Sequence, residues 1–351
     1  IIFHNKLTNK FKLTFKPYIL ELKHPFGISY YTRKNTPIVL TEIAYNGEVG
    51  YGEASMPQYL GETQESVIKF LSKVDLRNYN DLKDIDNILN YVDLIEEGNN
   101  AAKASVDIAL HDLVGKLLGI PVYKYFGLNK PTDAFTSYTI GIDSTVTIRN
   151  KLDEASEFKY YKIKLGAKND KEIIETVRKY TDSDLFVDVN QGWKDKKYAL
   201  DMIEWLAEYN VILVEQPLPK AQIDDLAWLN ENSPLPILAD EAVLRLNDIF
   251  QVKDIYSGIN IKLMKSTGLR EATAMIKKAR DLDMKIMLGC MTETSCAVTA
   301  AAHLCSLADW LDLDGPLLVK NDIFKGISYA EGSLHINDLP GIGIVRKKNL
   351  S

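Results

Sequence analysis

The stretch Tyr160-Tyr161-Lys162-Ile163-Lys164-Leu165-Gly166 places two lysines two residues apart inside an apolar run that ends at a glycine. Side chains alternate between the two faces of a strand, so both lysines would project from one face and the apolar residues from the other. Taken alone, this pattern is typical of a surface or edge strand with its lysines in water. The stretches that follow it favour a different interpretation.

Eight short apolar stretches recur along the chain, with starts 22 to 27 residues apart and helical patterns between them. They are residues 135–142, 160–166, 185–190, 211–217, 236–241, 258–264, 285–291 and 310–315. A strand, a helix and two short loops need about that many residues. We therefore expect an α/β fold with a closed parallel barrel. An open doubly wound sheet is the alternative, but the glycine-rich phosphate turn that often marks it is absent.

The first 120 residues or so have an α+β pattern. Two strands joined by Asn46-Gly47 form a predicted hairpin, and helices are expected over residues 63–71, 84–95 and 99–118. Residues 24–36 are rich in Gly, Pro and polar residues, which predicts an irregular loop that is either disordered or functional. The tail after Gly315 is too short for a domain, and we expect it to pack back on the N-terminal part.

Composition restricts the classes of partner. The net charge is −6 and no basic run occurs, which disfavours nucleic acid. There is no apolar run of membrane-spanning length and no signal-peptide pattern. The three cysteines (Cys290, Cys296, Cys305) are odd in number and lack metal-site spacing, which fits reduced thiols in a cytoplasmic protein.

Charged residues end several of the predicted barrel strands. Asp188, Glu215 and Asp240 close the third, fourth and fifth apolar stretches, and Lys164 and Lys262 lie on the second and sixth. In a βα barrel the chemistry lies at the carboxyl ends of the strands. A single charge there is more often an ion pair or a solvated rim, but charges on consecutive strands favour a site.

The residue types indicate a reaction. Three converging carboxylates without His or Cys suit a hard divalent cation, Mg²⁺ above all. Lys164 and Lys262 flank the carboxylates in strand order and would face each other across the barrel mouth. Two opposed bases imply that a proton leaves one face of a carbon and another arrives on the opposite face, while the metal stabilises an enolate. Lys162 would help to lower the pKa of Lys164.

These motifs resemble the enolase superfamily, muconate-lactonizing subgroup, and within it the dipeptide epimerases. The matching motifs are Lys162-Ile163-Lys164, Asp188-Val189-Asn190-Gln191-Gly192-Trp193, Val214-Glu215-Gln216-Pro217, Ala239-Asp240-Glu241 and Asn260-Ile261-Lys262-Leu263-Met264-Lys265. The resemblance implies a (β/α)7β barrel, a modified TIM barrel, at residues 126–317. It also implies an α+β capping domain at residues 1–125, completed by residues 318–351.

The resemblance further assigns the site residues. It implies one Mg²⁺ held by Asp188, Glu215 and Asp240. Lys164 and Lys262 are the implied acid/bases, and Lys162 stabilises the enolate oxygen. Asp312 and Asp314 look like the Asp-x-Asp pair that binds the free ammonium of a dipeptide. The alternative is that these aspartates form an ion pair or cap a helix.

Substrate selection is expected to involve a lid formed by residues 24–36. Ala-Glu epimerases carry an arginine there for the glutamate side chain, whereas this chain has Tyr31 at the expected offset, with Arg33 and Lys34 slightly later. This departure favours an apolar substrate side chain. The expected substrate contacts are Phe26, Ile28, Tyr31, Thr139, Asn190 and Met291, with Cys290 as pocket wall rather than nucleophile.

The predicted function is therefore an Mg²⁺-dependent dipeptide epimerase, a cytoplasmic isomerase and homo-oligomer acting on the α-carbon of the C-terminal residue. An L-Ala-D/L-Glu epimerase, an N-acylamino-acid racemase and an o-succinylbenzoate synthase or muconate cycloisomerase are alternatives. A non-enzymatic binding barrel is a further alternative. The pair Lys164 and Lys262 argues against it, because binding a carboxylate needs only one cation.

Overall fold

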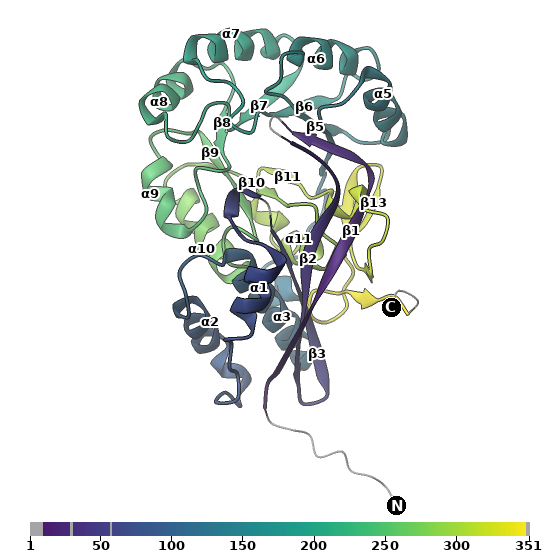
Figure 1. Cartoon of the computed structure of the whole chain (residues 1–351), viewed down its shortest axis with the longest axis vertical. Coiled ribbons are helices and arrows are strands. Elements are labelled where there is room, and N and C mark those ends of the chain that lie inside the picture. Colours follow the sequence, from purple (N-terminus) through teal and green to yellow (C-terminus); the bar gives the residue numbers. More distant parts are fainter. Residues whose placement is uncertain (1–9, 29–30, 57, 349–351) are drawn as a thin grey trace, which may run out of the picture.

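The computed structural model describes residues 10–28, 31–56 and 58–348 (Figure 1). The N-terminal part is an antiparallel sheet of β1 (Lys12–Ile28), β2 (Tyr31–Tyr45) and β3 (Glu48–Ser55), in the order β1-β2-β3. The turn between β2 and β3 has φ values of 50° at Asn46 and 87° at Gly47. Asparagine and glycine tolerate this left-handed backbone, so the predicted hairpin is confirmed.

The expectation of an irregular loop over residues 24–36 is wrong. Strand β1 continues to Ile28 and β2 begins at Tyr31, and they pair as Phe26 with Arg33 and Ile28 with Tyr31. The register shifts between Glu21 and Phe26, so the proline and polar residues are accommodated at an irregularity in the ribbon. Figure 1 shows the purple β1–β2 ribbon extending from the N-terminal sheet toward the barrel. The backbone NH of Ile142 donates to the carbonyl of Gly27 there (3.0 Å).

Helices follow the N-terminal sheet. They are η1 (Gln58–Leu60), α1 (Gln64–Leu71), η2 (Leu82–Asp84), α2 (Ile85–Leu94), α3 (Asn100–Leu118) and α4 (Val122–Tyr125). Thr63 caps α1 through its side chain, and Gly119 ends α3 in the left-handed conformation. The three predicted helices are therefore present with nearly the expected bounds.

Helix α3 lies unusually close to β3. A Cβ on Gly50 would stand 2.0 Å from the carbonyl oxygen of Ala109, and one on Gly52 would stand 1.9 Å from that of Ser105. Non-bonded atoms do not approach one another this closely, so only glycine permits this packing. The small residues of α3 and the glycines of β3 together fix the two elements against each other.

Eight parallel strands form the barrel in consecutive order, which confirms the predicted strands. They are β4 (Ser137–Ile140), β5 (Tyr160–Lys164), β6 (Asp184–Asp188), β7 (Val211–Glu215), β8 (Ile237–Ala239), β9 (Gly258–Lys262), β10 (Lys285–Gly289) and β11 (Trp310–Asp312). A parallel bridge between Thr136 and Leu311 joins the first strand region to the last. Phe186, Leu213, Leu238 and Met287 form an apolar cluster of their own, apart from the main core.

Helices connect the strands and surround the barrel, as Figure 1 shows for α5 to α8. They are α5 (Thr145–Glu154), α6 (Asp170–Arg178), α7 (Lys196–Ala207), α8 (Ile223–Asn232), η3 (Leu246–Asp248), α9 (Ile249–Val252), α10 (Leu269–Arg280), α11 (Ser295–Ala302) and η4 (Cys305–Leu307). After β11, the only helix within the described residues is the short η5 (Gly315–Leu318). The barrel is therefore of the (β/α)7β type.

The C-terminal tail contains short strands: β12 (Phe324–Lys325), β13 (Ser328–Ala330), β14 (Ser333–His335) and β15 (Val345–Arg346). Its contacts reach the N-terminal sheet and α3. Arg346 pairs with Glu42 (2.6 Å), and the backbone NH of Ile342 donates to Asp112 (2.9 Å). Division of the chain into domains at residues 125/126 and 317/318 stays a prediction.

Across the residues described, every helix is too short or too polar to cross a bilayer.

Candidate active site

Strand register brings the predicted charges to one end of the barrel. Lys164 on β5 pairs with Asp188 on β6, which in turn pairs with Glu215 on β7. On the other side, Gly289 of β10 pairs with both Lys262 and Asp312. Because the strands are parallel, their last residues meet at the carboxyl edge.

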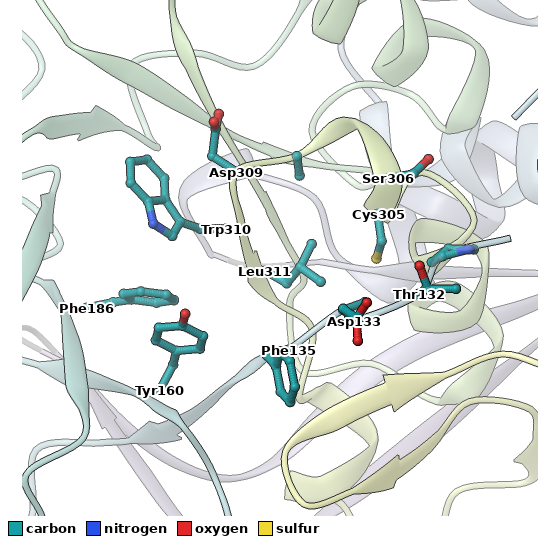
Figure 2. Close-up of a pocket in the computed structure, with 13 residues that line it drawn as sticks. Thr132, Asp133, Phe135, Tyr160, Phe186, Cys305, Ser306, Asp309, Trp310 and Leu311 are labelled. Atoms are coloured by element: carbon teal, nitrogen blue, oxygen red, sulfur yellow. The ribbon is translucent and has the colours of Figure 1, made fainter. Parts of the chain in front are cut away.

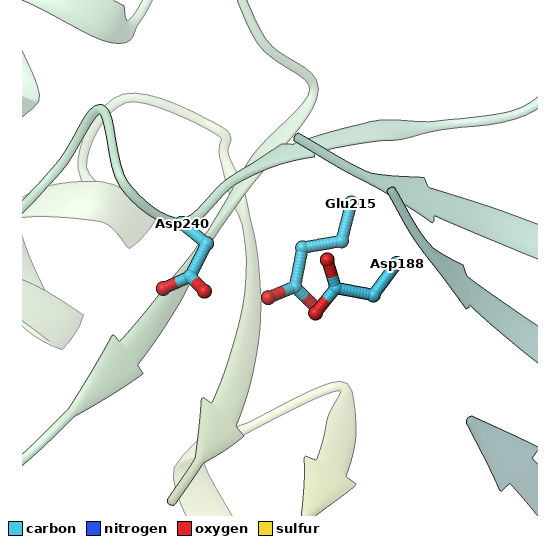
Figure 3. A group of neighbouring side chains, drawn as sticks. All are labelled: Asp188, Glu215 and Asp240. Carbon is cyan, nitrogen blue, oxygen red and sulfur yellow. The ribbon is translucent and has the colours of Figure 1, made fainter. Parts of the chain in front are cut away.

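The three predicted metal ligands converge. Each of Asp188, Glu215 and Asp240 offers an oxygen, and these oxygens lie within 4.8 Å of one another. Figure 3 shows the three carboxylates directed toward a common point. All three residues are almost completely buried. Groups of this charge are costly to remove from water unless cations compensate them.

Lysines provide compensation. Nζ of Lys162 lies 2.7 Å from Asp312, 2.8 Å from Glu215 and 3.1 Å from Asp188. Nζ of Lys164 lies 2.6 Å from Asp188, and Nζ of Lys262 lies 2.7 Å from Asp240. The predicted lysines and carboxylates therefore form one buried ionic cluster.

The pKa values reflect this cluster. Burial would raise the pKa of Asp188, but Lys164 and Lys162 outweigh it and lower the pKa to about 2. Burial and the neighbouring Asp188 instead raise the pKa of Glu215 to about 7. Burial opposes charge on Lys262, yet Asp240 and Glu215 raise its pKa above the usual value for lysine.

Lys265 also belongs to the cluster, and the sequence analysis gave it no role. It is buried and donates to Asp240 Oδ1 (2.6 Å), to the Asp240 carbonyl (2.8 Å) and to the Asn260 carbonyl (2.8 Å). It thereby fixes the rotamer of one predicted ligand. Its position three residues after Lys262, in the turn that follows β9, could have suggested this role.

The donor set fits Mg²⁺. The converging atoms are all carboxylate oxygens, which hard divalent cations prefer. Beside them Glu241 is buried, and its Oε2 has no hydrogen-bond partner among the described residues. Burial and Asp240 raise the pKa of Glu241 to about 8. A divalent cation would relieve this concentration of buried negative charge.

Three residues with a left-handed backbone lie beside the predicted ligands. Asn190 and Gln191 follow β6 with φ values of 47° and 63°, and Gln216 follows β7 with φ of 41°. Non-glycine residues adopt this region rarely, and such strain persists where surrounding contacts impose it. Asn190, a predicted substrate contact, donates through Nδ2 to Glu241 (3.2 Å).

Asp312 and Asp314, the predicted ammonium ligands, lie together at the end of β11. Ser137 donates to Asp312 (2.8 Å), and the backbone NH of Thr139 donates to Asp314 (2.6 Å). Burial and Asp312 raise the pKa of Asp314 to about 7. A bound cation would stabilise both carboxylates in their charged form.

One cavity joins these groups to the β1–β2 ribbon. Of the predicted substrate contacts, Phe26, Ile28, Thr139, Asn190 and Met291 line it, together with the three lysines, Asp240, Asp312 and Asp314. Cys290 lines it too, and burial raises the pKa of its thiol, which suits a wall rather than a nucleophile. The predicted contact through Tyr31 involves a side chain that lies outside the described part of the structure.

Three wall residues were not predicted: Arg33, Tyr59 and Leu318. Arg33 Nη2 donates to Thr292 Oγ1 (2.6 Å), and its guanidinium lies 5.6 Å from the centre of the Phe26 ring. Strand pairing explains this position, since Arg33 lies opposite Phe26 in the ribbon. The irregular loop assumed from the sequence gave no such register.

A second cavity lies at the amino end of the barrel, where Tyr160, Phe186 and Trp310 form its apolar floor (Figure 2). Two acidic residues, Asp133 and Asp309, line it, and Asp309 is already paired with Arg280 (2.7 Å) and accepts from the backbone NH of Ile286 (2.8 Å). The ionic cluster lies at the opposite end. The candidate catalytic groups therefore line the carboxyl-edge cavity.

Comparison with known proteins gives consistent matches. A model of the N-terminal domain of mandelate racemase/muconate lactonizing enzymes matches residues 14–127, and an enolase C-terminal domain-like model matches residues 147–349. The L-Ala-D/L-Glu epimerase of Bacteroides thetaiotaomicron is 54% identical over 338 residues, covering 96% of this chain and 88% of that protein.

Solved structures agree. A substrate complex of the L-Ala-D/L-Glu epimerase from Bacillus subtilis aligns with a TM-score of 0.89 and 30% identity, covering 96% of this chain and 99% of that one. The dipeptide epimerase from Cytophaga hutchinsonii, complexed with Mg and D-Ala-L-Val, aligns with a TM-score of 0.89 and 28% identity, covering 96% of both chains.

Proposed function

Since the chain belongs to the mandelate racemase/muconate lactonizing enzyme family of the enolase superfamily, we propose that it is an Mg²⁺-dependent dipeptide epimerase. It inverts the α-carbon of the C-terminal residue. The observation that carries this proposal is the arrangement of lysines around the carboxylates. Lys164 on β5 and Lys262 on β9 are separated by the three strands β6, β7 and β8. In a barrel of eight strands, positions four apart face each other across the mouth.

The opposed lysines divide the reaction between two faces of the substrate. One lysine, in its neutral form, takes the α-proton, and the electron pair left behind delocalises into the carboxylate as an enolate. The ammonium of the other lysine returns a proton to the opposite face. Lys162, held charged by Asp312 and Glu215, faces the developing negative charge.

Mg²⁺, when held by Asp188, Glu215 and Asp240, would neutralise these carboxylates and favour negative charge on the substrate carboxylate. Without a bound cation, Asp240 and Glu215 raise the pKa of Lys262. A cation that neutralised these carboxylates would lower that pKa and so make Lys262 a better base.

The substrate's free ammonium fits the Asp312–Asp314 end of the cavity. In the described structure Lys162 is the one lysine that pairs with these two carboxylates. Its single positive charge compensates only one of them when both are ionised. Muconate cycloisomerases, succinylbenzoate synthases and N-acylamino-acid racemases act on substrates without this ammonium, so the pair supports a dipeptide over those alternatives.

Arg33 supports an acidic side chain on the C-terminal residue. Its guanidinium lines the cavity, and such a group forms strong, directional bonds with carboxylates. The apolar preference predicted from the sequence rested on Tyr31 occupying the expected arginine position. Phe26, Ile28 and Met291 still provide apolar walls, and the two readings predict opposite orders of substrate preference.

The cysteines bear on the compartment in which the protein works. The three cysteines are free, which supports a reducing compartment such as the cytoplasm. We further propose that the protein is a homo-oligomer, which static light scattering or analytical ultracentrifugation of the purified protein would test.

The test is isotope exchange. The protein is incubated in D₂O with Mg²⁺ and L-Ala-L-Xaa dipeptides, and NMR follows deuterium at the C-terminal α-carbon. Exchange with inversion in dipeptides is expected. Turnover of an N-acylamino acid together with no exchange in any dipeptide would contradict the proposal.

A further inference from the structure

Glu53 is a buried carboxyl that the proposed mechanism does not use. It lies on β3 of the N-terminal sheet with no exposed surface, and its hydrogen bonds cross to the barrel. The backbone NH of Thr294 donates to its two oxygens (3.0 and 3.2 Å), and the Thr294 hydroxyl contacts Oε2. Burial, together with Glu293, raises the pKa of Glu53 to about 8. Near neutral pH this carboxyl is therefore chiefly protonated.

Thr294 is a well-defined anchor on the barrel side. It is the N-cap of α11, where its hydroxyl accepts from the backbone NH of Cys296 (3.0 Å). It also ends the segment that follows β10 and contains Met291 and Thr292, two walls of the active-site cavity. Fixing Thr294 therefore fixes one end of that segment.

A second bond from the same strand holds the middle of the segment. Ser55 is two residues after Glu53, so both side chains leave the same face of β3. Its hydroxyl donates to the carbonyl oxygen of Thr292 (3.1 Å). At Gly52 this strand packs directly against the backbone of Ser105 in α3, which supports its position.

The segment in turn holds Arg33. The Thr292 hydroxyl accepts from Arg33 Nη2 (2.6 Å), so the direction of the guanidinium depends on where Thr292 stands. Met291 is held from within the segment, since its backbone NH donates to Glu293 (3.0 Å). Glu53 and Ser55 thus act on the substrate side-chain pocket without touching the substrate.

We infer that Glu53, assisted by Ser55, is a positioning residue for substrate selection: it clamps residues 291–294 to the N-terminal sheet and so sets the direction of Arg33. This inference rests on the proposed function. Hydrogen bonds depend on direction, whereas apolar contacts do not. Loss of the clamp must therefore weaken recognition of an acidic side chain more than that of an apolar one.

Two substitutions of Glu53 distinguish the effect of its hydrogen bonds from the effect of its side-chain volume. Glu53→Gln keeps one donor and one acceptor, as the protonated acid has, while Glu53→Leu removes both at similar size. Glu48→Leu, at an exposed position of the same strand, is the control. KM and kcat are measured for L-Ala-L-Glu and for L-Ala-L-Leu with Mg²⁺ present.

For Glu53→Leu we expect the acidic-to-apolar ratio of kcat/KM to fall about 10-fold through KM, because a buried donor loses its partner. Its kcat should stay within about threefold of the wild-type value, and Glu53→Gln and Glu48→Leu should keep the wild-type ratio. An unchanged ratio in Glu53→Leu, or an equal loss for both substrates through kcat, overturns the inference.

If Glu53→Leu does not fold, Ser55→Ala tests the same clamp, with the same change of ratio expected. Amide hydrogen exchange of residues 290–296 in the Mg²⁺-loaded protein gives a readout that needs no substrate. Faster exchange in Glu53→Leu or Ser55→Ala than in Glu48→Leu supports the clamp, and unchanged exchange overturns it. Failure of the wild type to epimerise any dipeptide instead contradicts the proposed function and leaves the exchange result to decide on the clamp.

Discussion

Replacing Arg33 by methionine should exchange the order of substrate preference. The side chain lines the cavity, half-buried, and points its Nη2 at Thr292 Oγ1. In Arg33→Met the apolar stem remains against Phe26, while the cation that would meet a substrate carboxylate is gone. Recognition of an acidic side chain should suffer, and recognition of an apolar one should not.

The size of the effect follows from the burial of the contact. A hydrogen bond to a charged group contributes about 1.5–3 kcal/mol, and each 1.4 kcal/mol corresponds to about a factor of ten. Because Arg33 keeps partial access to solvent, screening places the loss at the lower end of that range. We expect kcat/KM for L-Ala-L-Glu to fall by about 10- to 30-fold. The value for L-Ala-L-Leu should stay within about threefold or rise.

The assay is initial-rate epimerisation of each dipeptide at fixed Mg²⁺, with Lys34→Met as control. Lys34 is the next residue, is exposed, and its loss changes the net charge by the same amount. An equal loss for both dipeptides in Arg33→Met would refute the assignment of Arg33 to the side chain. A wild-type enzyme that prefers L-Ala-L-Leu would favour the apolar pocket predicted from the sequence.

Three further outcomes are expected. Lys164→Ala and Lys262→Ala should each lower the rate of epimerisation by at least about 10³-fold. Each variant should still exchange the α-proton of one stereoisomer in D₂O, because the remaining lysine serves one face of the α-carbon. Wild-type epimerisation by either variant would contradict the two-base scheme. Gly52→Ala should lower the free energy of unfolding in urea by about 2 kcal/mol or more, because its Cβ would meet the carbonyl oxygen of Ser105 at 1.9 Å. Burial lowers the pKa of His303 to about 4, against 6.5 when exposed, so the unfolded chain binds the extra proton between these pH values. Relative to a His303→Gln variant, the wild type should lose about 3 kcal/mol of stability as the pH falls from 6.5 to 4, and equal pH profiles in urea would refute this.

Much of the barrel could be predicted from the sequence because each strand carries its own signal. The apolar stretches recur at nearly constant spacing, and parallel strands bring their carboxyl ends together without further information. The convergence of Asp188, Glu215 and Asp240 follows from these two facts. Lys162 and Lys164 look solvent-exposed only if the strand is considered alone.

The ribbon could not be predicted in the same way. Its pairing depends on backbone hydrogen bonds between β1 and β2, which tolerate Pro25 at a register shift and place Gly27 against the barrel. A Cβ on Gly27 would stand 2.4 Å from the carbonyl oxygen of Ile142, so this glycine marks a close contact rather than a flexible loop. Amino-acid composition does not distinguish a glycine in a close contact from a glycine in a flexible loop. The position of Arg33 was missed for the same reason.

The long ribbon also bears on how such an enzyme diverges. The residues that line the cavity from the ribbon, such as Phe26, Ile28 and Arg33, belong to a different part of the chain from the lysines and carboxylates of the barrel. A mutation in the ribbon leaves the ionic cluster intact, whereas a single change within the cluster leaves a buried charge uncompensated. Gene duplicates can therefore acquire new substrates through a few ribbon substitutions while inheriting the proton-transfer chemistry unchanged.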